Sequence, residues 1–374
     1  MQQYSSLKNR INTHLPDSYR TGHELCFTVH DFITGLLVTG QQAAAFNVPI
    51  TLHDEADRLA LEKAEDIFVW LEQTRRTDER NAVLVTAVFP AVLSDMVHCF
   101  YEALETSRKG KLGITYMLLR KPLQESLFLF ESIIVDRHDF GEKLTLEPSK
   151  LWSQGAGGLE PHTKRIRKVL DVIGQNDFFD PAYLAQLRYD KDAEDGFDGI
   201  CNKAMHLFTT HKAIRTEPLN INFIFSNIKS METQWAYLYS RLPYLLIYIY
   251  RVVEYICSTI VDINSAYFED MDRRMSALVL LWWDAIENND QEPHLKAFVQ
   301  NTQSWLNEHC NAAGYNAPTH ADLIRIVETG AYPNEPKYKR LARKLRFESE
   351  AEDLGVFHMS MHRKILNWAF DFFE

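Results

Sequence analysis

The sequence is poor in cysteine, the residue that cross-links a fold through disulfides. Its 374 residues include five cysteines, which are widely spaced and form no CxxC pair. This spacing argues against a disulfide framework and favours reduced thiols in a cytoplasmic protein. The N-terminal stretch MQQYSSLKNRINTHLPDSYR lacks the apolar core of a secretory signal. We therefore expect a cytoplasmic protein that uses no metal and no other cofactor.

Positive charge and long uncharged apolar runs are also scarce. The net charge of −11 excludes a general nucleic-acid-binding surface, although a local basic patch remains compatible with it. The apolar stretch Leu242–Ile263 is interrupted by Arg251 and Glu254, so its longest uncharged run is too short to span a bilayer. We interpret this stretch as a buried core helix and expect no membrane association.

Helical periodicity dominates what the sequence does contain. Apolar residues recur at helical spacing through Asn81–Thr106 and Leu118–Val135, whereas no strand alternation and no fixed repeat occur. The segment 220–263 predicts two aromatic-rich helices that are separated near Pro243. We therefore predict an all-α fold, an antiparallel helical bundle with additional N- and C-terminal helices. The expected segments are 1–80, the bundle 81–287 and a C-terminal appendage 288–374.

Two charged residues stand near the start of the apolar helix predicted at Leu118–Val135. Arg120 and Glu125 have leucines around them, and burying an unpaired charge costs several kcal/mol, roughly. In one interpretation, each side chain bridges to a neighbouring helix. In the other, both point into a central polar pocket where Arg120 binds a phosphate with its planar guanidinium.

A second polar cluster follows about eighty residues later. Asn202 and His206 are four residues apart and share a helical face, with Lys203 beside them. An imidazole can exchange protons near neutral pH, and an amide can orient it or hold a phosphate oxygen. The alternative is a structural histidine between helices. His211 follows closely and is a second candidate for the same role.

These clusters carry a resemblance to a known superfamily. The segment AVLSDMVHCFYEALETSRKGKLGITYMLLRKPLQESLFLFESIIVD and the later FDGICNKAMHLFTTH together resemble the helical HEPN superfamily, most closely its DUF5677-type branch. The resemblance covers about residues 81–211. Members are often metal-independent ribonucleases of toxin and antiviral-defence systems, with a site formed across a dimer. The resemblance thus implies RNA as a substrate and a homodimer.

The superfamily motif places an arginine before a polar residue, three variable residues and a histidine. In this sequence the last two correspond to Asn202 and His206, whereas Cys201 occupies the arginine position. Activity would then require Arg120 to supply the cation from the other helix. Under this hypothesis His206 transfers protons, while Arg120 or Lys203 stabilises the phosphate charge.

Two further features have competing interpretations. His358 and His362 have a zinc-compatible spacing, but no HExxH motif accompanies them, and we favour a surface helix face as the interpretation. A dense basic segment lies in KYKRLARKLR and is either a solvated amphipathic helix or a contact for RNA or an acidic partner. Its candidate binding residues are Lys337, Lys339, Arg340, Arg343 and Lys344.

The leading hypothesis is an RNA-directed effector of bacterial defence or of a toxin system. Its candidate catalytic residues are His206, Asn202, Arg120 and Glu125, and its candidate binding residues include Lys203 and His211. The alternative is a non-catalytic helical module that binds a protein, a nucleotide or RNA. Cys201 at the position of the motif arginine favours this alternative.

Overall fold

The computed structural model describes residues 13–207, 228–286, 292–343 and 345 of the chain. Every regular element in these ranges is helical and none of them is a strand, which confirms the predicted all-α class. Helical periodicity in the sequence is the physical reason, because apolar residues spaced three and four apart bury one face of each helix.

The helices that build the body are α2 (Arg20–Gln42), α5 (Thr77–Arg108), α6 (Leu112–Lys121), α7 (Leu127–Val135), α12 (Ile228–Ser258) and α13 (Ser265–Ala285). The peripheral α-helices are α3 (Glu55–Lys63), α4 (Ile67–Gln73), α8 (Arg137–Leu146), α9 (Leu159–Ile173), α10 (Pro181–Tyr189), α11 (Phe197–Met205), α14 (Pro293–Ala312) and α15 (His320–Thr329). Short 3₁₀ turns lie at η1 (Asp17–Tyr19), η3 (Pro148–Leu151) and η4 (Ser153–Ala156), and η2 (Pro122–Ser126) is a π turn.

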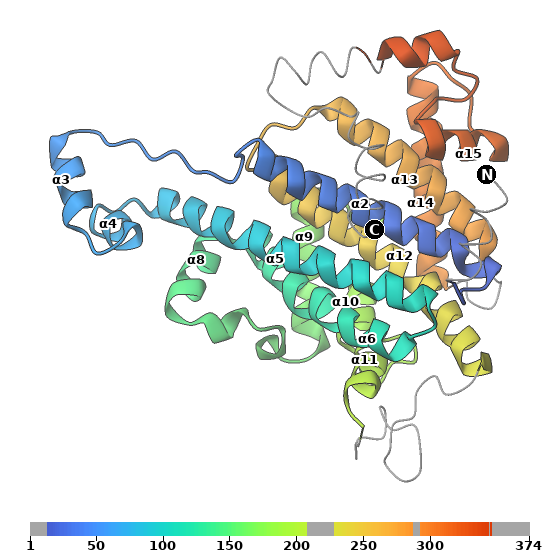
Figure 1. The fold of residues 1–374 in the computed structure, drawn as a ribbon, viewed down its shortest axis with the longest axis horizontal. Coiled ribbons are helices and arrows are strands. Elements are labelled where there is room, and N and C mark those ends of the chain that lie inside the picture. Colours follow the sequence, from blue (N-terminus) through green and yellow to red (C-terminus); the bar gives the residue numbers. More distant parts are fainter. Residues whose placement is uncertain (1–12, 208–227, 287–291, 344, 346–374) are drawn as a thin grey trace.

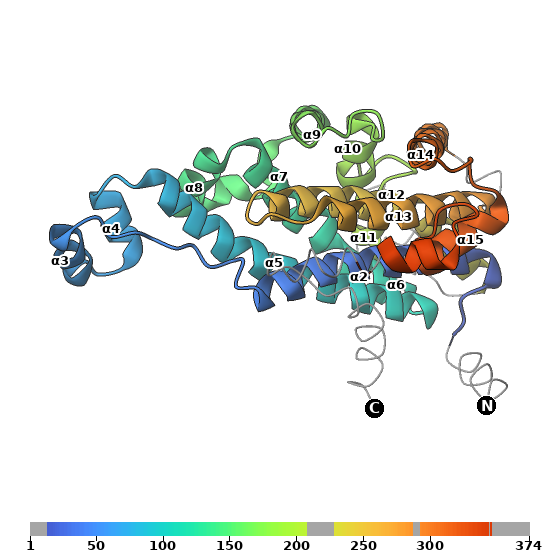
Figure 2. The ribbon, with the colours of Figure 1, turned by 90° about the horizontal axis from the view of Figure 1, so that it is seen from above.

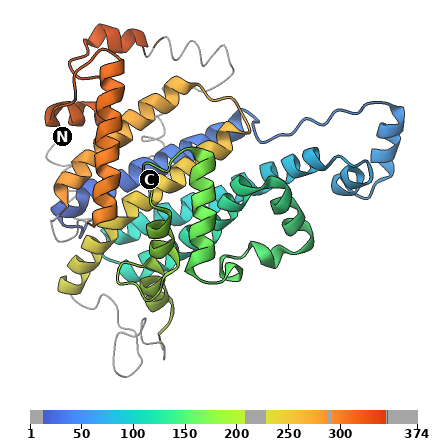
Figure 3. The same cartoon turned by 180° about the vertical axis from the view of Figure 1, so that it is seen from behind.

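The long helices are stacked in layers. Figure 1 shows α2, α5, α12 and α13 running along the length of the molecule. Seen from above in Figure 2, α2, α5 and α6 lie below α12 and α13, and α9, α10 and α14 lie above them. Figure 3 shows α9 and α14 crossing α12 and α13 on the far face. One large hydrophobic core joins these layers.

The expected N- and C-terminal segments are in contact with the central one. Helix α2, from the segment 1–80, packs against α5, α12 and α13. Helix α13 in turn packs against α14 and α15, which belong to the segment 288–374. Helices α3 and α4 form an arm that projects from one end of the body (Figure 1), and α3 buries none of its residues.

The segment Leu118–Val135 is helical throughout, but it is not one α-helix. It comprises the end of α6, the π turn Pro122–Ser126 and α7. Pro122 lacks an amide hydrogen and clashes with a regular α-helical turn, so the chain widens there. The structure therefore has a π turn that begins at Pro122.

The predicted break at Pro243 is wrong, because α12 continues through it. A proline in a helix leaves the carbonyl of the residue four positions earlier without its usual amide donor. For Pro243 this residue is Tyr239, and its carbonyl oxygen accepts a hydrogen bond from the indole Nε1 of Trp282, 2.7 Å away. The tryptophan of α13 thus replaces the lost donor, and burial of almost every residue from Leu242 to Cys257 stabilises the continuous helix.

One helix in the described part of the chain, α5, is long and apolar enough to cross a membrane by length and composition alone. Core helices pass the same test, and α5 contributes Phe89, Leu93 and Phe100 to the core. Its length and composition are therefore weak evidence for a membrane span.

Candidate functional site

The two polar clusters singled out in the sequence lie on neighbouring helices. Helix α6 packs against α11, and the rings of Tyr116 and Phe197 lie 6.4 Å apart between them. One helical turn further along each helix stand Arg120 and Cys201. Burial and Asp198 raise the pKa of the Cys201 thiol, and the nearby positive charge of Arg120 partly offsets this. Arg120 therefore lies near Cys201, on the neighbouring helix. We call this contact region the α6–α11 seam.

Two cations at the seam have no carboxylate partner among the described residues. Arg120 is half-buried, and its Nε is buried without a hydrogen-bond partner. Lys203 is also half-buried, and burial lowers the pKa of its ammonium group. Elsewhere, the buried Arg188 pairs with Glu131 and the half-buried Arg251 pairs with Asp272. An unpaired buried cation costs free energy, so these two positions are suited to an anionic ligand.

Asn202 is held by Asp198 within the seam. Its Nδ2 donates to Asp198 Oδ1 at 2.9 Å and to the Asp198 carbonyl at 2.8 Å. Gln124 of the π turn donates from Nε2 to the same carboxylate oxygen at 2.8 Å. Asp198 thus links α11 to the π turn. Sequence reasoning missed Asp198 and Gln124, although the i, i+4 spacing of Asp198 and Asn202 was a usable signal.

Glu125 lies apart from this arrangement. Its carboxylate accepts hydrogen bonds from Ser153, at 2.7 Å from Oγ and 3.2 Å from the backbone nitrogen. These bonds tie the π turn to the short turns η3 and η4. The bridging interpretation therefore describes Glu125 better than the central-pocket interpretation does.

His206 is exposed and caps the C-terminus of α11. Its backbone nitrogen donates to the Asn202 carbonyl at 3.0 Å, so both residues belong to the last turn of the helix. The exposure of His206 means that a ligand can reach this end of α11 from solvent. His211, His358 and His362 lie outside the described residues.

The basic segment is divided between solvent and structure. Lys337 and Lys339 are exposed and Arg340 is half-buried, whereas Lys344 lies outside the described residues. Arg343 donates to the Gly330 carbonyl and to the Glu335 carboxylate, each at 3.0 Å. Arg343 therefore anchors the segment that follows α15, and only its neighbours are available to a partner.

A buried ionic network around Glu131 is the main polar feature that sequence reasoning missed. Glu131 of α7 is fully buried and paired with Arg188 of α10, which is also fully buried. Arg165 of α9 donates to Glu131 at 3.2 Å, and the Tyr248 hydroxyl of α12 donates at 2.9 Å. Burial opposes ionisation of Glu131, but Arg188 and Arg165 outweigh it and hold the pKa of the carboxyl below its usual value.

The Glu131 network also determines the protonation state of a nearby histidine. His162 of α9 stacks on Tyr189 with ring centroids 3.6 Å apart and hydrogen-bonds Arg165. Burial, together with the charges of Arg165 and Arg188, lowers the pKa of His162 to about 4. The imidazole is therefore neutral at physiological pH. A carboxylate within the very apolar sequence LFLFESIIV was the signal for this network, because such a charge requires a partner.

Within the described ranges, no group of three or more histidine, cysteine, aspartate or glutamate side chains could hold a metal ion. Comparison of the chain with protein-family models, with curated proteins and with solved structures returns no match.

Proposed function

We propose that this chain is a HEPN-like, RNA-directed effector that binds RNA phosphates at the α6–α11 seam and cleaves the RNA without a metal. The observation that carries the proposal is that Arg120 lies near Cys201 of the neighbouring helix and that its buried Nε has no partner among the described residues. An arginine from α6 is thereby available where the superfamily motif has its own arginine. Lys203 adds a second cation on α11 that has no carboxylate partner among the described residues.

The chemistry requires a proton transfer and a stabilised phosphate. Attack of a ribose 2′-hydroxyl on the adjacent phosphorus forms a cyclic phosphate and breaks the bond from phosphorus to the 5′-oxygen. The hydroxyl gives up its proton to a base, and the 5′-oxygen takes up a proton from an acid. His206 serves as the general acid or base, because its imidazole is exposed at the end of α11. Arg120 and Lys203 stabilise the additional negative charge of the phosphorane. A homodimer would bring two such seams to one RNA.

The test compares variants of the full chain on mixed single-stranded RNA. We expect Arg120→Gln to weaken RNA binding and to reduce the slope of log affinity against log salt by about one. His206→Ala should abolish cleavage while leaving binding within about twofold. The matched control is Arg167→Gln, which removes an exposed arginine from α9. Equal RNA affinity for wild type and Arg120→Gln would refute the proposed site.

A non-catalytic binding module is the second candidate. It is favoured by the buried Cys201 at the motif arginine position and by the commitment of the Asn202 amide group to Asp198. This candidate predicts RNA binding that depends on Arg120, with no cleavage by wild type or by His206→Ala. The same assays therefore separate the two functions.

A further inference from the structure

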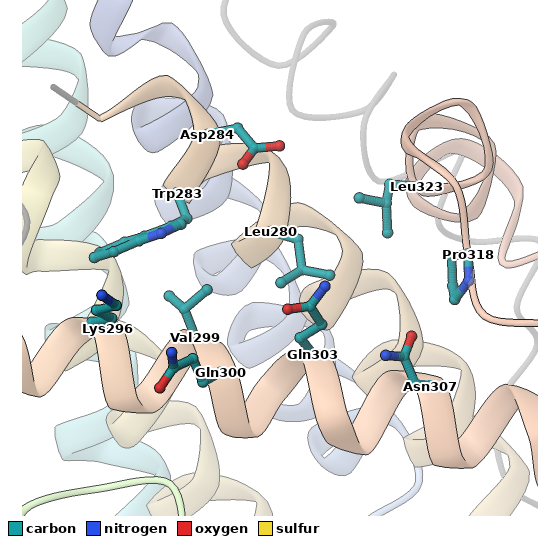
Figure 4. Close-up of a pocket in the computed structure, with 10 residues that line it drawn as sticks. All are labelled: Leu280, Trp283, Asp284, Lys296, Val299, Gln300, Gln303, Asn307, Pro318 and Leu323. Atoms are coloured by element: carbon teal, nitrogen blue, oxygen red, sulfur yellow. The ribbon is translucent and has the colours of Figure 1, made fainter. Parts of the chain in front are cut away.

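A groove far from the α6–α11 seam lies between α13 and α14. It has a volume of about 270 Å³, and Pro318 and Leu323 close one end (Figure 4). Figure 4 shows the Trp283 ring at the other end, next to Lys296. The lining residues are Leu280, Trp283, Asp284, Lys296, Val299, Gln300, Gln303, Asn307, Pro318 and Leu323.

The polar side of this groove is one face of α14. Lys296, Gln300, Gln303 and Asn307 follow one another at intervals of four, three and four residues, which places them in a row along the helix. The three amide side chains make no hydrogen bond to any described residue. Each amide carries both donors and an acceptor, so the row can match a ligand whose edge alternates the two.

The floor of the groove is apolar. Leu323 and Val299 are buried, and Leu280 is half-buried. Trp283 is half-buried as well, and its ring contacts that of Trp282 edge-on, with 6.3 Å between the ring centroids. A ligand with a flat apolar face can therefore lie against Leu280 and Trp283 while its edge meets the amides of α14.

The dimensions and the chemistry of the groove favour a small heteroaromatic ring. Its volume lies slightly below that of pockets for drug-sized ligands, roughly 300–1,000 Å³. Asparagine and glutamine amides pair with the donor and acceptor edge of adenine, and aromatic rings stack on bases. Lys296 adds a cation for an attached phosphate.

We propose that this groove binds a nucleobase of single-stranded RNA, adenine foremost. The inference deepens the proposed function and rests on it for the identity of the ligand as RNA. The seam holds the backbone, and the groove holds an unstacked base. Since α14 and α6 lie on opposite sides of α12 and α13 in Figure 2, the two contacts engage different parts of one strand.

The test is a ligand-observed NMR titration of the full chain with AMP and with ribose 5-phosphate, which lacks the base. We expect AMP to bind and ribose 5-phosphate to bind at least about tenfold more weakly. The double variant Gln300→Ala/Gln303→Ala should weaken AMP binding by about tenfold or more, because a good bidentate base contact is worth that much. Both glutamines are exposed, so the fold should be retained.

The control variant is Gln73→Ala, which truncates an exposed glutamine of α4 in the same way. It should bind AMP as wild type does. Equal affinity for AMP and ribose 5-phosphate, or unchanged AMP binding by the double variant, would overturn the base site. Displacement of AMP by an unstructured peptide but not by oligoadenylate would also overturn it and indicate a peptide groove.

These assays test the groove and the seam separately. If RNA binding depends on Arg120 but not on Gln300 and Gln303, only the base site is refuted. If neither Arg120→Gln nor the double variant weakens RNA binding, both sites are refuted. If AMP binding depends on the two glutamines while RNA affinity does not depend on Arg120, the groove is supported and the seam is refuted.

Discussion

Arg188 and Glu131 form an ion pair that is completely shielded from solvent, with one partner on α10 and the other on α7. Arg188 Nε also donates to the Leu123 carbonyl at 2.7 Å, at the π turn that precedes α7. The pair thus joins α7, α10 and the π turn, and the donors Arg165 and Tyr248 add α9 and α12 to it.

Glu131→Gln should destabilise the protein strongly. The substitution removes the counter-charge of Arg188 and Arg165, and breaking a buried pair from one side costs about 3–5 kcal/mol. Urea denaturation measures the free energy of unfolding. The matched variant is Glu125→Gln, on the preceding turn, which loses only charge-assisted bonds to Ser153 and should cost about 1–2 kcal/mol. Equal losses for both variants would contradict a special role for Glu131.

A second buried group makes stability depend on pH. Burial, opposed by Arg251 and reinforced by Asp272, raises the pKa of Glu254 to about 7 from an ordinary value of 4.5. Between these two values the native protein holds a proton that the unfolded chain releases. The stabilising contribution of Glu254 is therefore complete below pH 4.5 and is lost as the pH rises to 7.

Glu254→Gln should abolish this pH dependence. Relative to wild type, the variant should gain up to about 3 kcal/mol of unfolding free energy as the pH rises from about 4.5 to about 7. Denaturation curves at several pH values measure the difference. Glu308→Gln, at an exposed site on α14, is the matched control for the loss of one carboxylate. A pH-independent difference for Glu254→Gln would show that this carboxyl titrates normally.

Gly330→Ala should disturb the C-terminal end of α15. Gly330 has a φ of +63°, and a Cβ there would overlap Asp270 Oδ1 and lie 2.8 Å from Arg274 Nη2. Gly174, at the end of α9, has a φ of +67°, and a methyl group there would have nothing within 4 Å. Gly174→Ala should therefore cost only the left-handed backbone penalty, about 1–2 kcal/mol. Gly330→Ala should cost about 1–3 kcal/mol more in thermal or urea unfolding.

Arg343→Gln and Lys339→Gln separate anchoring from binding in the basic segment. Arg343 bonds to Glu335 and Gly330, so its loss should lower stability by about 1–3 kcal/mol. Lys339 is exposed, and its loss should leave the unfolding free energy within about 0.5 kcal/mol. If the segment contacts RNA, only Lys339→Gln reduces RNA affinity without reducing stability. Unchanged affinity in Lys339→Gln would restrict the segment to its structural role.

The all-α class was predictable because each helix carries its own apolar periodicity. The continuity of α12 was not, since the donor that rescues the Tyr239 carbonyl belongs to Trp282, forty-three residues away. Local rules treat Pro243 as a break, and only tertiary packing supplies the missing hydrogen bond.

For the candidate site, too, the sequence predicted local features but not the contacts between distant residues. The sequence pattern singled out Arg120 and Asn202, and α6 and α11 are neighbours. It did not identify Asp198, whose role depends on Gln124 from a helix seventy-four residues earlier. The sequence analysis treated Glu125 as the carboxylate of the apolar helix that needs a partner. In the structure, Glu131 of the same segment is the fully buried carboxylate. Burial depends on which helices cover a face, and this information is absent from local spacing.

The π turn at Pro122–Ser126 determines which side of the molecule each charge of this segment serves. Arg120 and Glu131 are eleven positions apart, close to three full turns of an uninterrupted α-helix, which would direct both side chains to the same face. The additional residue of a π turn rotates everything after it by about 100° around the axis. This phase shift directs the cation toward α11 and the carboxylate toward the interior. A regular α-helical turn of the same length would realign the two charges and leave Arg188 buried without its counter-ion.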